Sequence, residues 1–238
     1  MENENTLISE IKQLTQIKEE NKINRIFLFI SELKEWNNKF NLTSITENRQ
    51  IIIRHIIDSL EILKCGILQQ GNEIIDLGTG AGLPGIPLSI MEPEIKVSLV
   101  ESNNKKVLFL NHIKEKLDLK NISIVNARAE IISADKKYRE RFYSACARAL
   151  APFPVALESG IALVKSDGYM FFYMSKKQKD EMKENMNTME ALGCQIHQIH
   201  DYSLPLSMGD YSIVIVKKMW KTDKKYPRQY SKIRKNPL

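Results

Sequence analysis

The sequence predicts an α/β fold in which a mostly parallel, doubly wound sheet of seven strands follows an N-terminal helical extension. Residues 7–65 show helical periodicity and no strand signal, whereas short apolar segments alternate with helical segments from residue 72 onward. That alternation is typical of parallel βα units. A glycine-rich stretch, NEIIDLGTGAGLPGIP at 72–87, joins the first strand to a short helix. We therefore divide the chain into a helical extension at 1–66, a doubly wound domain at 67–220 and a basic tail at 221–238.

The composition is that of a globular protein with one substantial core. Of the 238 residues, 43% are hydrophobic and 27% are charged, as in soluble domains. No apolar run approaches the roughly 18 residues of a membrane helix, and the N-terminus lacks the pattern of a signal peptide. Three cysteines without a C-x-x-C pair (Cys65, Cys146 and Cys194) indicate reduced thiols. We expect a cytoplasmic monomer with no metal site and no membrane partner.

The helical extension contains one strongly patterned helix. Apolar residues recur there at three- and four-residue steps and form a stripe on one helix face. The stretch Asn41-Leu42-Thr43 interrupts the pattern, and another helix is expected to start near Thr46 or Glu47 and to cover 51–63. The stripe consists of Ile23, Ile26, Phe27, Ile30, Leu33 and Trp36, and the polar residues of the later helix are Arg54, His55, Asp58 and Ser59.

The domain that follows is expected to alternate strands and helices and to end in an antiparallel pair of strands. The predicted strands are 73–76, 95–101, 121–126, 142–147, 168–174, 195–202 and 211–217. The predicted helices are 86–91, 103–117, a short one around Glu130, 154–164 and a Lys- and Glu-rich one at 175–190.

The glycine-rich stretch indicates a ligand site. Asp76 ends the first strand, and Gly78, Gly80 and Gly82 follow at alternate positions. A sharp turn from strand to helix places backbone N–H groups at the carboxyl edge of the sheet, where such folds bind nucleotides. The dinucleotide fingerprint G-x-G-x-x-G would require glycine at the position of Leu83. The pattern D-x-G-x-G-x-G instead resembles the first motif of class I S-adenosylmethionine methyltransferases, a Rossmann-like fold whose ligand has no pyrophosphate.

Polar residues follow the later strands as well. Glu101 ends the second strand, where a carboxylate can accept hydrogen bonds from ribose hydroxyls. The stretch NARAE at 126–130 follows the third strand, where such folds hold adenine. Arg148 lies at the tip of the fourth strand and could grip a phosphate or a carboxylate with both arms of its guanidinium. The nearby Cys146 is better explained as a small core thiol than as a nucleophile.

The net charge of +6 is concentrated at the C-terminus. Residues 217–238 hold nine basic residues and one acid, so the remainder of the chain is nearly neutral. A basic tail suits sequence-independent contacts with RNA phosphates. Lys105 and Lys106 open a helix near the expected ligand, where they are either solvated or in contact with RNA.

Several stretches together resemble one family, the bacterial 16S rRNA guanine-N7 methyltransferase G, also called glucose-inhibited division protein B. They are WNNKFNLTSI (36–45), RHIIDSL (54–60), IDLGTGAGLPGIPLSI (75–90), ESNNKKVLFL (101–110), NARAE (126–130), ARAL (147–150) and KKYPR (224–228). The resemblance covers nearly the whole chain. It implies methyl transfer from S-adenosylmethionine, leaving S-adenosylhomocysteine, to a guanosine of 16S rRNA, presented naked or in the small ribosomal subunit.

The resemblance also assigns roles to residues. It implies that Arg54 and His55 bring the extension to the rim of the site and that Arg148 positions the reaction. Guanine N7 carries a lone pair and no proton, so no general base is expected, and His55 is the sole weak candidate for one. Cofactor contacts are expected at Asp76, Gly78, Gly80, Gly82, Leu83, Glu101, Ser102, Ala129, Glu130 and Arg148, and RNA contacts at Arg54, Lys105, Lys106, Lys224, Lys225 and Arg228.

Two other classes remain open from the sequence. One is an NAD-dependent oxidoreductase, although Leu83 in place of glycine and the lack of a catalytic Lys/Tyr motif count against it. The other is a non-catalytic RNA-binding module with a vestigial cofactor pocket.

Overall fold

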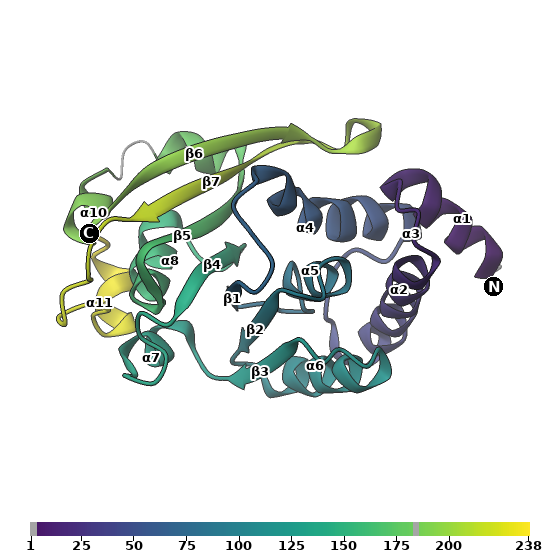
Figure 1. Cartoon of the computed structure of the whole chain (residues 1–238), viewed down its shortest axis with the longest axis horizontal. Coiled ribbons are helices and arrows are strands. Elements are labelled where there is room, and N and C mark those ends of the chain that lie inside the picture. The colour runs from purple at the N-terminus through teal and green to yellow at the C-terminus, as the bar shows by residue number, and fades with distance from the viewer. Residues whose placement is uncertain (1–3, 183–185) are drawn as a thin grey trace.

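The computed structural model describes residues 4–182 and 186–238, which fold around a single twisted sheet (Figure 1). Its strands are β1 (Glu73–Leu77), β2 (Lys96–Glu101), β3 (Ile122–Asn126), β4 (Phe142–Arg148), β5 (Val164–Ser175), β6 (Cys194–Ser203) and β7 (Asp210–Lys218). Within the described residues the seven strands lie in the order β3-β2-β1-β4-β5-β7-β6. The strands β1 to β5 are parallel, and β7 runs antiparallel to β5 and β6. The expected mostly parallel sheet with a closing hairpin is confirmed.

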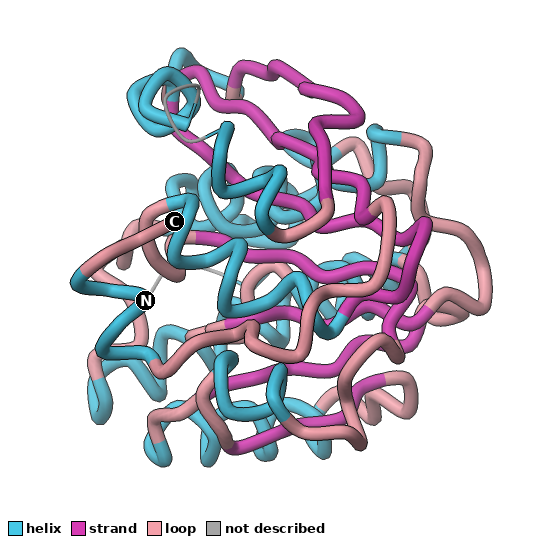
Figure 2. The backbone as a smooth tube through the Cα atoms, turned by 90° about the vertical axis from the view of Figure 1, so that its left-hand side faces the viewer, coloured by secondary structure: helices cyan, strands magenta, loops and turns pink. Residues whose placement is uncertain are grey.

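Helices cover both faces of the sheet (Figures 1 and 2). One face carries α1 (Glu4–Thr15), α2 (Glu20–Phe40), α5 (Gly85–Met91) and α6 (Asn104–Lys116), and the other carries α7 (Ala129–Ala134), α8 (Phe153–Gly160), α9 (Lys176–Met182) and α10 (Met186–Ala191). Successive residues of a strand point to opposite faces. Ile74 therefore packs in one apolar cluster and Ile75 in the other. Over the described part of the chain, no helix is long and apolar enough to cross a membrane.

The helical extension shares an apolar cluster with the sheet. The α2 stripe buries Ile23, Ile26, Ile30 and Leu33 against α5 and α6. Phe29 of α2 is also fully buried, and its ring centroid lies 6.4 Å from that of Phe109 in α6. The stripe predicted from the sequence is largely confirmed, although its members Phe27 and Trp36 are only partly buried and Phe29 is an additional core residue. The extension is therefore built onto the domain, while the boundaries at 66 and 220 stay a prediction.

A single helical run follows the extension's first two helices. It comprises α3 (Asn48–Ile51), a π-helix η1 (Ile52–Ile57), α4 (Asp58–Leu60) and a 3-10 helix η2 (Glu61–Cys65). The Glu47 side chain caps it by accepting hydrogen bonds from the N–H groups of Arg49 and Gln50. The predicted start near Glu47 is confirmed.

Three elements differ from the sequence-based prediction. The predicted helix 154–164 ends earlier, as α8 followed by a 3-10 turn η3 (Ile161–Leu163), because Val164 already pairs with Phe142 in the sheet. The predicted helix 175–190 is described as α9 and α10, and its residues 183–185 lie outside the described residues. The tail contains a helix, α11 (Tyr230–Lys235), that charge alone did not predict.

Candidate active site

The loop after β1 is folded around a buried carboxylate. Asp76 is fully buried, and its Oδ2 accepts hydrogen bonds from Oγ1 of Thr79 at 2.6 Å and from the N–H of Gly85 at 2.9 Å. Burial raises the pKa of Asp76 to about 6. The structure does not support a direct cofactor contact for Asp76, because this side chain holds the loop from inside the protein.

The three glycines of the loop have different roles, although all have positive φ. A Cβ on Gly82 would lie 2.3 Å from Cγ1 of Ile86, and one on Gly78 would lie 2.5 Å from Cδ1 of Leu150. A Cβ on Gly80 would meet nothing closer than Nζ of Lys106 at 3.8 Å. Gly82 is therefore required for packing, whereas the space beside Gly80 is open to a ligand.

The carboxyl ends of the first strands border a cavity of about 170 Å³, which we call the glycine-loop cavity. Four of the residues expected to bind the cofactor line it: Gly78, Ser102, Ala129 and Glu130. Gly80, Gly82, Leu83, Glu101 and Arg148 are not among its lining residues. Leu83 belongs to the apolar core instead, so a cofactor contact through its side chain is not supported.

Glu101 lies beside this cavity with its carboxylate held in place. Its Oε2 accepts from the N–H of Gly80 at 3.0 Å, and its Oε1 accepts from the N–H of Asn103 at 2.8 Å. A carboxylate has about four acceptor sites, so two remain for the two hydroxyls of a ribose. The acidic strand end, the open glycine and the cavity together fit the nucleoside part of S-adenosylmethionine.

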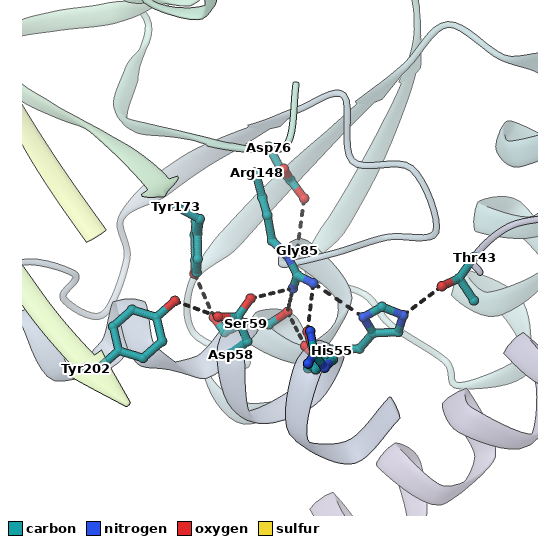
Figure 3. Close-up of polar contacts among 10 residues, drawn as sticks. Thr43, His55, Asp58, Ser59, Asp76, Gly85, Arg148, Tyr173 and Tyr202 are labelled. Carbon is teal, nitrogen blue, oxygen red and sulfur yellow. Dashed lines mark hydrogen bonds and ion pairs between the residues drawn. The ribbon is translucent and has the colours of Figure 1, made fainter. Parts of the chain in front are cut away.

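Arg148, at the end of β4, is bound by the helical extension (Figure 3). Its Nη1 donates to Oγ of Ser59 at 2.9 Å and forms an ion pair with Oδ2 of Asp58 at 3.2 Å. Its Nη2 donates to the carbonyl of Arg54 at 2.8 Å and lies 3.3 Å from Nδ1 of His55. The guanidinium that the sequence assigned to a ligand is therefore already occupied by groups of the protein.

The π-helix η1 explains how the carbonyl of Arg54 becomes an acceptor for Arg148. An α-helix would direct the N–H of Asp58 to the carbonyl of Arg54. Here that N–H bonds to the carbonyls of Ile53 and His55. The wider turn presents the Arg54 carbonyl to Arg148, in line with the frequent occurrence of π turns at functional sites.

His55 is held neutral between two partners. Because a guanidinium only donates, Nδ1 of His55 must be the acceptor toward Arg148, and Nε2 carries the proton toward Oγ1 of Thr43 at 2.9 Å. Burial and the charge of Arg148 lower the pKa of His55 to about 4. His55 is thus a neutral positioning group, which agrees with the expectation that it is a weak candidate for a base.

Two tyrosines extend the network toward the sheet's antiparallel edge. The hydroxyl of Tyr202 donates to Oδ1 of Asp58 at 2.5 Å, and that of Tyr173 donates to the carbonyl of Ser59 at 2.8 Å. Burial raises the pKa of Asp58 and of both tyrosines. Figure 3 shows these side chains converging from β5, β6 and the extension on one point at the end of β4.

A larger depression, which we call the Arg148 trough, opens over the ends of β4 and β5. It consists of cavities of about 540 and 210 Å³ that share Ala149, Tyr173, Met174 and Gln178. The trough and the glycine-loop cavity share Leu150 and Ala151, just after β4. The 540 Å³ part of the trough therefore borders the glycine-loop cavity at this short segment, whereas the 210 Å³ part shares no lining residue with that cavity.

The basic residues expected to bind RNA lie in two places. Arg54 lines the trough, and Lys106 lies over the glycine loop. Lys224 and Lys225 are exposed near Asp223, whose carbonyl accepts from Arg139 just before β4 begins. Lys224 and Lys225 therefore lie near the amino edge of the sheet. The seven residues of β4 span roughly 20 Å, so these lysines are about that far from the carboxyl edge, where the cavities lie.

Two residues from the sequence analysis have structural roles. Arg228 is paired through Nε and Nη2 with the fully buried carboxylate of Glu158 at 2.8 and 2.5 Å, so its assignment to RNA is not supported. Cys146 is fully buried in the sheet, and burial raises the pKa of its thiol well above the usual value. The expectation of a core thiol at Cys146 agrees with both observations.

Comparison with known proteins identifies the family. The family model described as "GidB: rRNA small subunit methyltransferase G" matches residues 22–207. The chain belongs to this family. It is 42% identical over 221 residues to a ribosomal RNA small subunit methyltransferase G of Acetivibrio thermocellus, covering 92% of this chain and 90% of the relative. A ribosomal RNA small subunit methyltransferase G of Lachnoclostridium phytofermentans is 35% identical over 238 residues. The alignment covers 100% of this chain and 98% of the relative. The family resemblance inferred from the sequence is confirmed.

Solved structures support the fold assignment as well. An rRNA methylase from Streptococcus thermophilus has a similar structure, with a TM-score of 0.50 at 15% sequence identity. The superposition covers 69% of this chain and 96% of the methylase chain. The [4+2]-cyclase SpnF is similar with a TM-score of 0.53 at 13% identity, covering 68% of this chain and 81% of its own. The class I methyltransferase fold is confirmed. Because a cyclase shares it, the fold alone does not fix the reaction.

Some site residues were missed by sequence reasoning. Leu150 was part of a recognised motif, but nothing in the pattern placed its side chain on Gly78. Tyr230 lines the glycine-loop cavity although it lies far along the chain in the tail, which was considered only for its charge. An aromatic residue within a basic segment was the one available signal.

Proposed function

We propose that this protein transfers a methyl group from S-adenosylmethionine to N7 of a guanosine in 16S rRNA. One observation carries the proposal beyond family membership: the glycine-loop cavity and the Arg148 trough meet at Leu150 and Ala151. A donor and an acceptor placed in the two cavities face each other at the end of β4. Family membership does not favour the oxidoreductase or the vestigial RNA-binding module.

The glycine-loop cavity is proposed to hold the cofactor. S-adenosylmethionine supplies an electrophilic methyl group on a sulfonium when bound. Glu101 is suited to the ribose hydroxyls, and Ala129 and Glu130 are suited to the adenine. Gly80 permits close approach of the ligand because the space beside it is open.

The Arg148 trough is proposed to receive the guanine as an exposed base. Enzymes that modify RNA bases need the base out of its stack. The trough combines the rings of Tyr173, Tyr202 and Tyr211 with the polar groups of Arg54 and Gln178. Arg148 acts here as a positioning residue, because its bonds to the extension fix the shape of one wall.

The protein is proposed to work without a general base. Neutral guanine N7 has an in-plane lone pair and loses no proton on attack, so catalysis requires alignment of donor and acceptor. A histidine whose pKa is about 4 accepts protons poorly at neutral pH. The side chains around the trough therefore orient the base and exclude water.

Arg54, Lys105 and Lys106 are proposed to contact phosphates near the modified base. Lys224 and Lys225 are proposed as more distant contacts that only a long RNA reaches. We further propose a cytoplasmic monomer that acts on the rRNA or on the small ribosomal subunit.

The test is transfer of labelled methyl groups to naked 16S rRNA and to assembled small subunits in parallel. Transfer to either substrate supports the proposal, and the better one identifies the physiological form. Failure with both, while S-adenosylmethionine binds, would overturn the methyltransferase assignment.

A further inference from the structure

The C-terminal tail folds back along the domain and reaches the glycine-loop cavity. After β7 ends at Lys218, near the amino edge of the sheet, the chain runs along α8 to α11 (Figure 1). Tyr230, the first residue of α11, lines the cavity together with Gly78, Ser102 and Glu130. The family model matches residues 22–207 and so ends before this segment, although the resemblance noted in the sequence includes KKYPR at 224–228.

Two arginines hold the tail in this position. Arg139 donates to the carbonyls of Thr222, Asp223 and Tyr226 at 2.6, 3.0 and 2.8 Å. Arg228 forms the two-armed ion pair with buried Glu158. Such pairs are geometrically specific and costly to break when one partner is buried.

Ile233 of α11 is fully buried. The bonds of Arg139 and Arg228 anchor the chain before Tyr230, and Ile233 anchors it after Tyr230. Both ends of the segment that carries Tyr230 are therefore fixed. Tyr230 is therefore presented by an ordered wall of the cavity.

The ring of Tyr230 lies beside a guanidinium in the wall of the cavity. The guanidinium carbon of Arg128 lies 5.2 Å from the centroid of the Tyr230 ring, and both residues line the cavity. Arg128 precedes Ala129 and Glu130, the residues suited to adenine. An aromatic ring beside these groups offers an apolar face to a purine, which favours stacking.

We propose that Tyr230 forms an aromatic wall for the adenine of S-adenosylmethionine, so that the tail is part of the cofactor site. The inference rests on the proposed function and deepens it. It also replaces the view of the tail as a purely electrostatic RNA contact: removing residues 221–238 would weaken cofactor binding as well.

The test compares four variants by calorimetry with S-adenosylmethionine and with methylthioadenosine, which lacks the amino-acid part. Tyr230→Ala is expected to bind both ligands about 5- to 150-fold more weakly, the range measured when an aromatic ring stacked on a base is removed. Tyr230→Phe keeps the ring and should bind within about twofold of the wild type. Lys232→Ala, an exposed position on the same helix, is the matched control and should bind as the wild type does. Tyr230→Leu keeps apolar bulk and should be intermediate.

The outcome separates this inference from the proposed function. An unchanged affinity in Tyr230→Ala, or an equal loss in Tyr230→Phe, overturns the aromatic wall. A loss for S-adenosylmethionine but not for methylthioadenosine also overturns it, because the adenine is common to both. If Tyr230→Ala does not fold, Tyr230→Leu and Tyr230→Phe decide. A wild-type protein that binds neither ligand would instead refute the proposed cofactor site.

Discussion

Nη2 of Arg148 lies 2.8 Å from the backbone carbonyl of Arg54, and this bond joins the end of β4 to the helical extension. The carbonyl is available because the π-helix η1 directs the N–H of Asp58 elsewhere. The extension and the domain thus share one wall of the Arg148 trough. The behaviour of the site depends on that wall, on the neutral His55 beside it and on the loop that closes the other cavity.

Arg148→Lys is expected to slow methyl transfer by about tenfold or more, although the charge is kept. Lysine lacks the planar fork that donates to Ser59 and Arg54 at once. Single-turnover transfer to rRNA measures the effect. The control is Arg141→Lys, an exposed position near the start of β4, where activity and stability should remain near those of the wild type. Equal rates for wild type and Arg148→Lys would contradict the positioning role.

The rate of single-turnover methyl transfer should be nearly constant from about pH 6 to 9. Guanine N7 needs no deprotonation, and the pKa of His55 of about 4 lies below this window. Rapid-quench experiments across the range provide the measurement. A rising limb that disappears in His55→Ala would show that a general base is required.

His55 should make the protein less stable as the pH falls below about 6.5. In the folded state its pKa is about 4, and in the unfolded chain it is about 6.5, so between these values the unfolded state binds more protons. Stability therefore rises with pH across this window, by on the order of 3 kcal/mol in total.

The check on this stability effect is urea unfolding of wild type and His55→Gln at pH 4.5 and 7.5. The wild type should lose more stability on acidification than the variant. Asp76, whose pKa is raised to about 6, acts in the opposite sense between about 3.8 and 6. It is present in both proteins and cancels in the comparison. Equal losses would mean that His55 is not held neutral.

Substitutions in the glycine loop should separate binding from folding. Gly80→Val is expected to abolish binding of S-adenosylmethionine because its side chain would enter the open space beside the loop, and to cost some stability because φ of Gly80 is +61°. Gly82→Ala should lower the thermal midpoint more, since its Cβ would lie 2.3 Å from Ile86. Calorimetry and thermal unfolding of both variants test this. Tight binding by folded Gly80→Val would remove the loop from the cofactor site.

Salt dependence should distinguish the two groups of basic residues. Replacing Lys105 and Lys106 by Ala should reduce the slope of log affinity against log salt for a short RNA hairpin, by about 0.7–0.9 for each phosphate that is no longer neutralised. Replacing Lys224 and Lys225 by Ala should leave the slope of log affinity against log salt unchanged for the hairpin. The slope should fall only for full-length rRNA. The same effect of both pairs on the hairpin would contradict the placement of the tail lysines.

Much of the fold was predictable because it follows from local pattern. The alternation of apolar strands with helices, and the glycines after Asp76, encode the order of elements and the edge that binds ligands. The boundary at Val164 was not predictable in this way, because it depends on pairing with Phe142 across the sheet. A continuous apolar run does not distinguish the end of a buried helix from the start of a buried strand.

The sequence motifs of the site were predictable, whereas many of the side-chain contacts within the site were not. Gly78, Ala129 and Glu130 belong to stretches that follow parallel strands in sequence, whereas Ser102 was expected only from the family resemblance. The partners of Arg148 and the position of Tyr230 arise from segments distant in sequence that meet only in the folded chain. The pairing of Arg228 was not predictable because its charge is visible in the sequence, whereas its neighbour in space, the buried carboxylate of Glu158, is not.

The proposed reaction delivers the methyl group to guanine N7 in 16S rRNA. The most direct measurement is transfer from labelled S-adenosylmethionine to rRNA and to small subunits, followed by digestion to nucleosides and mass spectrometry. We expect label in 7-methylguanosine alone, with at most one methyl group per rRNA, and a lower yield from Arg148→Lys. Label in another nucleoside, or none from a protein that binds the cofactor, would contradict the proposed reaction.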